Sequence, residues 1–375
     1  MEQIEIKIFD TFPAAESVWK QFEASSIYYA FQDYHWLERW YRHIGKDEGA
    51  TPCITAIWIK KDNQRQPLML LPFAVYKTGP LRLLKFMGGE VTDYFAPLVT
   101  EKQHLQDPKW FSTLWPEIKK ALPAYDAARL IKLPETLETL GNPLLQLDTI
   151  PYAESHSATL QPNWDDYYTC QIKKKIRADS RRQRKRLAEL GELRFMIAED
   201  DEHYRQITEA MIEHKQRRYA ETEVTDLLAR DNYRNFYLDH QNAFGSEALI
   251  HACALYVGDE IVATHWGAVL DKRYYFLMPT YAGGDWKRYS VGRILLEELM
   301  QWCFDQELTV FDFSLGGEQY KKEWCDQAMP LYEVLDAKTL PGQVYVTGQK
   351  AKKKLLSNPR ILKQVWKIKT YIENR

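Results

Sequence analysis

Apolar and polar residues follow one another along the first 155 residues in a pattern that predicts a mixed α/β unit. Residues 54–60 and 68–76 are rich in apolar and β-branched residues and flank a polar turn, which predicts two strands. Residues 36–43 and 108–121 are expected to form helices, and the first of them is rich in aromatic side chains. The polar, proline-containing stretch 149–164 is the predicted linker to the second half.

The second half predicts two helices and then an antiparallel meander. The first helix is strongly basic, and its less charged face carries Ile176, Ser180, Gln183, Leu187 and Leu190. The second helix covers about residues 203–220. Three apolar runs separated by polar turns then predict the strands of the meander, at 249–257, 261–270 and 273–278.

A glycine-containing loop follows the meander and leads into another helix. The loop covers residues 281–290, and the predicted helix covers residues 291–305 with Leu295, Leu299 and Trp302 on its inner face. A short strand at 309–314 comes next. The second half therefore reads as two helices, three strands, a loop into a helix, and a further strand.

The size and composition of the chain indicate a globular protein of two domains. Its 375 residues correspond to two domains of roughly 100–200 residues each. Apolar residues make up 45% and charged residues 27%, so there is enough apolar material to exclude disorder for most of the chain. We expect an N-terminal domain over 1–155, a C-terminal domain over 156–335 and a tail over 336–375.

Neither a membrane span nor a metal site is expected. No uncharged run approaches the roughly 20 apolar residues that a bilayer-spanning helix needs, and the acidic N-terminus does not resemble a signal peptide. The cysteines are far apart and lack metal-binding spacing, so we expect a reduced, cytoplasmic protein. They are Cys53, Cys170, Cys253, Cys303 and Cys325.

Basic charge is concentrated in two short segments. Residues 173–186 and 350–375 each contain nine basic residues and one acidic residue, although the formal net charge of the chain is −2. The first segment is either a solvated helix face or a site for the phosphates of nucleic acid, an anionic lipid surface or a long polar substrate. It contains no aromatic residue, which argues against nucleic acid as a partner. The second segment is weakly amphipathic, and it either contacts a membrane surface or packs back on the protein.

Several motifs resemble the CelD/BcsL group of GNAT-like proteins, which is named for a link to cellulose biosynthesis and is related to the FemAB-like transferases. The C-terminal motifs are Ser290-Val291-Gly292, Phe311-Asp312-Phe313 and the segment GGEQYKKEW at 316–324. The N-terminal motifs are FQDYHWLERWY at 31–41, LPF at 71–73 and GGEVTDYFAPL at 88–98, and the basic helix ends in KRLAELGELRF at 185–195. The resemblance covers about residues 30–335.

The resemblance implies an α/β (α+β) fold of two tandem GNAT-like domains with a cleft between them. It implies acetyl-CoA or another acyl-CoA as the acyl donor, bound by the second domain only. The acceptor would be an amine or hydroxyl of a small molecule or saccharide in polysaccharide biosynthesis. The group's N-terminal signature would place Asp93 and Tyr94 in the cleft, where the alternative is a simple turn entering a strand.

The loop before the helix at 291–305 is the candidate donor site. Unpaired backbone N–H groups at a helix N-terminus attract phosphates, and a glycine lets a phosphate approach closely. The candidate residues are Arg288, Tyr289, Ser290, Val291, Gly292 and Arg293. The alternative is an ordinary helix with a serine N-cap. The usual GNAT loop reads Gln/Arg-x-x-Gly-x-Gly/Ala, whereas Tyr289 and Ile294 occupy its first and last positions here.

Candidate catalytic groups lie in the meander and after the last strand. They are His265, Asp312, Glu318 and Tyr320, and the candidate substrate-binding residues are Asp93, Tyr94, Trp266 and Lys321. A neutral histidine or a carboxylate can accept the proton of the attacking acceptor, and a tyrosine can protonate a thiolate. For His265 the alternative is a hydrogen-bonded core histidine. Because no cysteine stands in a nucleophile motif, we expect direct attack without an acyl-enzyme.

Three functions remain open at this point. The first is an acyltransferase that uses acyl-CoA. The second is a FemAB-like aminoacyl transferase that uses aminoacyl-tRNA, although no sustained heptads predict the coiled-coil arm usual in that family. The third is a non-catalytic binding module on a GNAT scaffold, against which the intact motifs argue.

Overall fold

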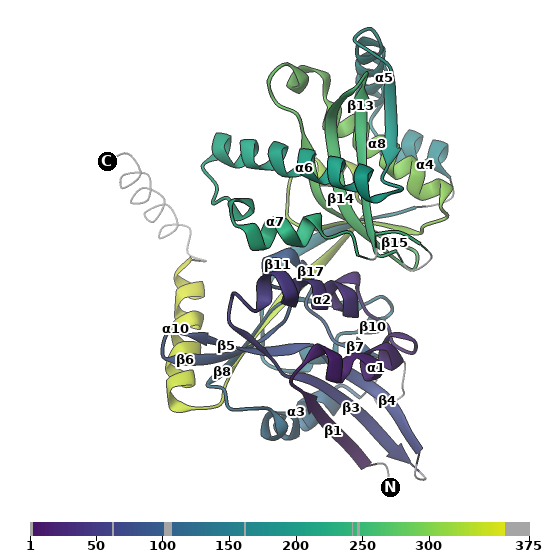
Figure 1. Ribbon diagram of the computed structural model, residues 1–375. Helices are drawn as coiled ribbons and strands as arrows, with labels where there is room; N and C mark the ends of the chain where they lie inside the picture. Colours follow the sequence, from purple (N-terminus) through teal and green to yellow (C-terminus); the bar gives the residue numbers. More distant parts are fainter. Residues whose placement is uncertain are drawn as a thin grey trace.

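The protein consists of two lobes stacked along one axis (Figure 1). The computed structural model describes residues 3–61, 64–100, 107–160, 163–241, 243–245 and 248–356. The N-terminal lobe contains the described residues up to 148 and the last helix, α10 (Leu340–Leu356). The C-terminal lobe extends from α4 (Trp164–Gln171) to α9 (Lys321–Trp324). Two long strands, β11 (Thr149–Thr159) and β17 (Gln327–Ala337), join the lobes.

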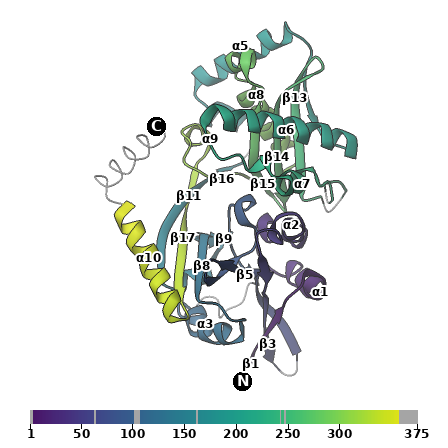
Figure 2. The same cartoon turned by 60° about the vertical axis from the view of Figure 1, so that its left-hand side comes forward.

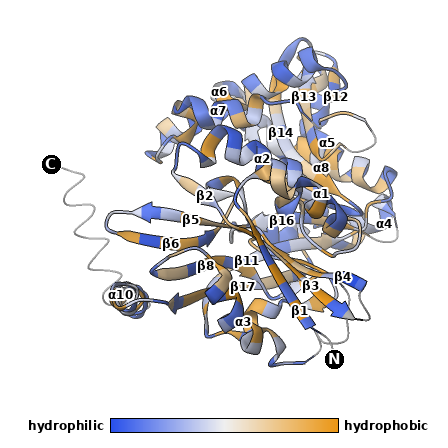
Figure 3. Ribbon diagram, turned by 60° about the horizontal axis from the view of Figure 1, so that its bottom comes forward, coloured by the Kyte–Doolittle hydropathy of each residue, from blue (hydrophilic) through white to orange (hydrophobic). Residues whose placement is uncertain are grey.

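The N-terminal lobe combines short strands with helices on their faces. Its strands are β1 (Gln3–Phe9), β2 (Ala50–Pro52), β3 (Ile54–Lys61), β4 (Gln64–Leu71), β5 (Phe73–Thr78), β6 (Leu81–Phe86), β7 (Leu98–Val99), β8 (Ala127–Pro134), β9 (Thr136–Leu137) and β10 (Leu140–Gly141). Its helices are α1 (Phe12–Glu23), α2 (Tyr34–Trp40) and α3 (Trp110–Ala121). Strand β4 changes along its length from exposed polar residues to buried leucines, and Figure 3 shows the same change of colour. This gradient places the first residues of β4 in solvent and its end in the core.

The C-terminal lobe contains the predicted meander. Its elements are α5 (Lys174–Ala188), β12 (Leu193–Ile197), α6 (Asp201–Thr222), α7 (Asp231–Leu238), β13 (Ile250–Val257), β14 (Glu260–Leu270), β15 (Arg273–Tyr281), the 3₁₀ helix η7 (Gly284–Tyr289), α8 (Val291–Asp305) and β16 (Val310–Leu315). Helices α6 and α8 pack on opposite faces of the meander. Every residue of β13 is therefore buried, since side chains of both its faces meet a helix.

One sheet of eleven strands runs through both lobes, in the order β12-β13-β14-β15-β16-β11-β17-β8-β6-β5-β2. Strand β11 pairs with β16 on one edge and with β17 on the other, and β17 pairs in turn with β8. The segment predicted as a linker therefore forms a central strand. Its polar sequence hid this role, because its stability comes from the backbone pairing of two neighbouring strands.

Strands β15 and β16 are parallel neighbours that separate. They pair only between Arg273–Tyr275 and Val310–Asp312. Beyond that point β15 stays paired with β14 as far as Tyr281, and β16 stays paired with β11. The two strands thus diverge toward their carboxyl ends and leave an opening in the sheet next to the first turn of α8.

The lobes also meet through a cluster of aromatic side chains. Trp36 of α2 contacts Phe236 of α7 and Trp266 of β14, with ring centroids 5.6 and 5.8 Å apart. The Trp266 side chain is buried, and its Nε1 donates a hydrogen bond to Tyr204 of α6. Trp266 is therefore an interlobe core residue, which contradicts its prediction as a substrate-binding residue.

Helix α10 returns to the N-terminal lobe and packs on β8 and β17 (Figure 2). Its Lys353 forms an ion pair with the buried Glu333 of β17, which Arg129 of β8 also contacts. The predicted tail is thus helical up to Leu356, and residues 357–375 lie outside the described part of the chain. Among the described residues, no helix is long and apolar enough to cross a membrane.

Candidate active site

A cavity of about 550 Å³ occupies the opening between β15 and β16. Its walls come from the end of β15, the first turn of α8 and the short helix α9. The lining residues are Phe276, Pro279, Thr280, Tyr281, Trp286, Lys287, Ser290, Val291, Gly292, Arg293, Leu295, Leu296, Tyr320, Glu323 and Trp324. The cavity thus brings together four of the six predicted donor-site residues with one predicted catalytic residue, Tyr320.

The first turn of α8 leaves backbone donors available to a ligand. Ser290 adopts a left-handed conformation with φ +55°, and its side chain makes no capping hydrogen bond. The alternative reading as a serine-capped helix is therefore wrong. At Gly292 an added Cβ would lie 3.6 Å from the ring of Tyr281, an ordinary contact. Packing does not require glycine there, whereas the close approach of a ligand would.

Cationic side chains surround this turn unequally. Lys287 lines the cavity and pairs with Glu221 at 3.0 Å, and Arg293 lines it and pairs with Asp179. Arg288 points elsewhere, with a 59% exposed side chain 3.7 Å from Asp285. Tyr289 is buried beneath Arg186 of α5, whose guanidinium lies 4.7 Å from the ring centroid. Neither Arg288 nor Tyr289 lines the cavity, which contradicts their predicted contact with the donor.

The loop after β16 places charged groups beside the opening. Lys321 is buried, and its Nζ donates to the carbonyl of Leu315 at 2.8 Å and pairs with Glu318 at 2.9 Å. Burial acts to raise the pKa of Glu318, but the hydrogen bond and charge of Lys321, a backbone hydrogen bond and the charge of His156 together outweigh it, and the net shift is downward. Gly316 has φ +124°, and an added Cβ there would lie 2.5 Å from Glu318 and 3.0 Å from Lys321. The glycine of the motif thus makes room for the ion pair.

Burial raises the pKa of Tyr320. The side chain lines the cavity, so its hydroxyl group stays protonated at neutral pH within reach of a bound molecule. A neutral phenol can donate a proton to a departing thiolate.

Asp93 reaches the same region from the N-terminal lobe. Its carboxylate lies 4.0 Å from Nζ of Lys132, and it interacts with Lys321 and with the backbone of Leu315 at the end of β16. Burial raises the pKa of Asp93 even though both lysines oppose the shift. A carboxylate of raised pKa beside the opening is a better proton acceptor than an ordinary aspartate.

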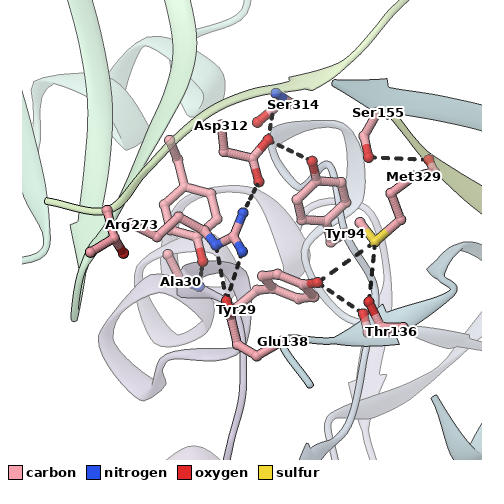
Figure 4. Close-up of polar contacts among 12 residues, drawn as sticks. Tyr29, Ala30, Tyr94, Thr136, Glu138, Ser155, Arg273, Asp312, Ser314 and Met329 are labelled. Carbon is pink, nitrogen blue, oxygen red and sulfur yellow. Dashed lines mark hydrogen bonds and ion pairs between the residues drawn. The ribbon is translucent and has the colours of Figure 1, made fainter. Parts of the chain in front are cut away.

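Asp312 lies at the boundary between the lobes and accepts hydrogen bonds at both of its carboxylate oxygens (Figure 4). Its Oδ1 accepts from the Tyr94 hydroxyl at 2.7 Å and from the Ser314 N–H at 2.8 Å, and its Oδ2 accepts from Arg273 at 2.9 Å. Arg273 also pairs with Glu138 of the N-terminal lobe. These groups border a second, polar cavity of about 240 Å³ between the lobes. Asp312 and Tyr94 therefore anchor one lobe to the other, and both carboxylate oxygens of Asp312 already accept hydrogen bonds from within the protein.

His265 is a buried core histidine. Its Nε2 accepts from the Leu277 N–H at 3.1 Å, so its Nδ1 carries the proton and donates to the Tyr274 hydroxyl at 2.8 Å. Its ring stacks on Phe276 with the centroids 4.2 Å apart, and burial lowers its pKa well below the usual value. The prediction of a catalytic His265 is wrong, because both ring nitrogens are occupied and the side chain is fully buried.

Sequence reasoning missed Arg273 and Lys132. Arg273 follows a polar turn, where charged residues are common. Lys132, which has φ +52°, interrupts an apolar strand. A lysine at an otherwise buried strand position was the available signal, since such a group needs a partner.

Comparisons with known proteins agree with this geometry. Residues 174–322 match the acetyltransferase (GNAT) domain family. No match was found among curated proteins. The structure of FemX is 11% identical, with a TM-score of 0.57 over 89% of this chain and 95% of its own. A conserved protein of unknown function from Bacteroides thetaiotaomicron is also 11% identical, with a TM-score of 0.52 over 89% of this chain and 100% of its own.

The structural matches cover most of the chain, whereas the family match covers only residues 174–322. The structural likenesses show the fold over most of the chain, and they confirm the predicted mixed α/β fold of tandem GNAT-like units. The family match covers the lobe that holds the cavity. Residues 174–322 in the C-terminal lobe thus match the acetyltransferase (GNAT) domain family, and the chain shares its overall fold with FemX.

Proposed function

We propose that the protein transfers an acyl group from an acyl-CoA-type thioester to an amine or hydroxyl acceptor. The observation that carries this proposal is the cavity between the diverging strands β15 and β16, which ends at the uncapped first turn of α8. Such a turn binds phosphates through its backbone N–H groups and the helix dipole. An apolar cavity leading away from it suits a pantetheine arm.

Phosphates of the donor would lie at Ser290–Arg293, next to Lys287 and Arg293. The thioester would then lie deeper in the cavity, near Tyr320 and the opening of the sheet. The acceptor would approach from the side of the N-terminal lobe, where Asp93 and Lys321 lie at the end of β16.

The chemistry is direct attack of the acceptor on the thioester carbonyl. Asp93 takes the proton of the attacking amine or hydroxyl, and its raised pKa suits that task near neutral pH. Tyr320 protonates the departing thiolate. Lys321 and Lys132 attract the carboxylate of Asp93, and they would attract an anionic group of the acceptor in the same way. Direct attack also fits the buried Cys303, because its strongly raised pKa keeps the thiol protonated and makes it a poor nucleophile.

The motifs at Ser290–Gly292 and Gly316–Trp324 favour membership of the CelD/BcsL group, and with it a saccharide-type acceptor in polysaccharide biosynthesis. They also favour a cytoplasmic site of action, where acyl-CoA is available.

A Gly292→Asp variant tests the donor site. An aspartate in the first turn of a helix is favourable for the helix, and the Cβ would make only an ordinary contact with Tyr281. The fold should therefore persist while the carboxylate repels the phosphates. We expect CoA binding, measured by isothermal titration calorimetry, to fall by at least about 100-fold, equivalent to about 2.7 kcal/mol.

The matched control is Gly348→Asp, which introduces the same residue at an open position of α10. It should leave CoA binding unchanged. Unaltered CoA affinity in Gly292→Asp, with an unchanged circular dichroism spectrum, would refute the donor site.

Aminoacyl transfer from a charged tRNA is a second candidate. The exposed cations of α5, which lie close to the donor cavity, favour it. Electrophoretic mobility of tRNA with the purified protein tests it, because tRNA that fails to bind at low salt removes this candidate.

A further inference from the structure

A basic groove continues from the donor cavity along α5. This groove of about 690 Å³ shares the lining residues Arg293 and Glu323 with the donor cavity, so the two spaces adjoin. The full lining consists of Lys173, Lys175, Ile176, Ala178, Asp179, Arg182, Arg293 and Glu323. A molecule bound at the first turn of α8 therefore lies next to α5.

Helix α5 is fixed in place by its inner side. Ser180 donates to Glu297 of α8 at 2.5 Å, and Arg184 pairs with both Glu297 and Glu298. Gln183 and Leu187 are buried on the same face. The opposite face is thereby held rigidly toward solvent.

Cations on the outer side of α5 are not matched by carboxylates. Lys174, Lys175, Arg181 and Lys185 are exposed and have no ion pair within the described ranges of the chain. The helix has 15 residues and is about 22 Å long at 1.5 Å per residue. Unmatched cations spread over this length fit a large anionic partner.

The groove distinguishes between two kinds of partner. The lining offers no aromatic ring on which a base could stack, which disfavours RNA. Ile176 and Ala178 give the groove an apolar centre between cations. An acidic, amphipathic helix of a protein complements this arrangement, because its carboxylates meet the lysines and its apolar residues meet Ile176.

We propose that the acyl donor is delivered by a small acidic carrier protein that docks on α5 and inserts a phosphopantetheine arm into the donor cavity. This inference rests on the proposed function and names the donor's carrier. The arm's phosphate binds at the first turn of α8, and the acyl thioester passes toward Tyr320. The acceptor's new bond to the acyl carbon replaces the carbon–sulfur bond. The acceptor's proton passes to Asp93, and the carrier leaves as a thiol protonated by Tyr320.

The test measures binding of three probes to the full chain. The first is an acyl carrier protein of fatty-acid synthesis that carries an acetyl group through a non-hydrolysable amide. The second is CoA, and the third is unfractionated tRNA. The variant is Lys174→Glu/Lys175→Glu, in which acidic residues at the start of α5 suit the helix dipole and preserve the fold. The control is Lys77→Glu/Lys352→Glu, an equal charge change at exposed positions of the N-terminal lobe.

We expect the carrier protein to bind more tightly than CoA and to lose at least about tenfold in affinity in the α5 variant. CoA binding should stay within about twofold in both variants, and raised salt should weaken carrier binding. The inference is overturned if the carrier binds no better than CoA, if the α5 variant binds it normally, or if tRNA is the probe whose binding depends on Lys174 and Lys175. Failure of CoA to bind the unmodified protein would instead refute the donor site of the proposed function.

Discussion

Asp93 shows how one residue acquires a catalytic character from its surroundings. It belongs to the N-terminal lobe, but its carboxylate interacts with Lys132 of its own lobe and with Lys321 of the other. Burial raises its pKa although two cations pull in the opposite direction. The result is a carboxylate that holds its proton more firmly than usual, which is what a base working near neutral pH requires.

An Asp93→Asn variant should lower kcat by about 10²–10⁴-fold, the usual contribution of a general base. The base must be deprotonated, so the activity of the unmodified protein should fall as pH decreases through the raised pKa of Asp93. The variant should lose this acid limb. A pH–rate profile of both proteins, with an acceptor found by screening, measures the effect.

Stability provides the control for this variant. A carboxyl group whose folded pKa lies above its unfolded value costs stability once pH exceeds the unfolded value. Asp93→Asn should therefore unfold at a higher temperature than the unmodified protein at pH 8, and at an equal temperature near pH 3. An intact acid limb in the variant would exclude Asp93 as the base.

Individual residues of the site differ in how well the sequence predicts their surroundings. Ser290–Arg293 and Tyr320 line one cavity, because a short motif at a strand or helix end keeps its local geometry, and their roles stay predictions. His265 was misjudged, because period-two alternation indicates which face of a strand a residue occupies but not whether a helix covers that face. Asp312 was predicted to be catalytic, but two of its hydrogen-bond donors, Tyr94 and Arg273, come from distant segments that the sequence does not bring together.

At the scale of elements, the local patterns predicted the helices and the meander well. The strands β13, β14 and β15 follow one another through short turns, so each pairs with a strand that is adjacent in the sequence. Strands β11 and β17 are more than 160 residues apart and pair with each other. Their sequences are mixed and partly exposed, and only the assembled sheet selects that pairing.

Helix α10 offers a prediction at this scale. Glu333 of β17 is fully buried and joins Arg129 of β8 to Lys353 of α10. Replacing it in Glu333→Ala leaves two cations without their shared partner and should lower the free energy of unfolding by about 3 kcal/mol. Lys353→Ala removes one partly exposed cation and should cost about 1 kcal/mol or less. Urea denaturation measures both values.

A matched variant separates charge from packing in this helix. Lys353→Met keeps most of the side-chain volume, so it should resemble Lys353→Ala only if the ion pair matters more than the contacts. Equal losses for Glu333→Ala and Lys353→Ala would show that Arg129 alone does not stabilise the buried carboxylate.

At the scale of the whole molecule, the two lobes are not separate folding units. The eleven-stranded sheet passes through both, and the lobes also share aromatic packing and the contacts of Asp312. The proposed site depends on this arrangement, since its proposed base Asp93 and its proposed donor cavity come from different lobes.

A single cooperative unfolding transition is therefore expected. The tryptophans lie in both lobes, so thermal unfolding followed by tryptophan fluorescence and by far-ultraviolet circular dichroism should give coincident curves. Addition of CoA should raise the midpoint of the whole transition by mass action. Two separate transitions, with only one of them shifted by CoA, would contradict this picture.

The position of β17 in the chain has a consequence for synthesis on the ribosome. Strand β8 of the N-terminal lobe and strand β11 both pair with β17. This strand begins at Gln327, so it is synthesised long after both of its partners. A nascent chain shorter than this carries unpaired edges at β8 and β11, and such edges are prone to wrong pairing with other chains. The N-terminal lobe therefore cannot be completed first, although it is translated first, and both halves of the enzyme become native together when the last strand arrives.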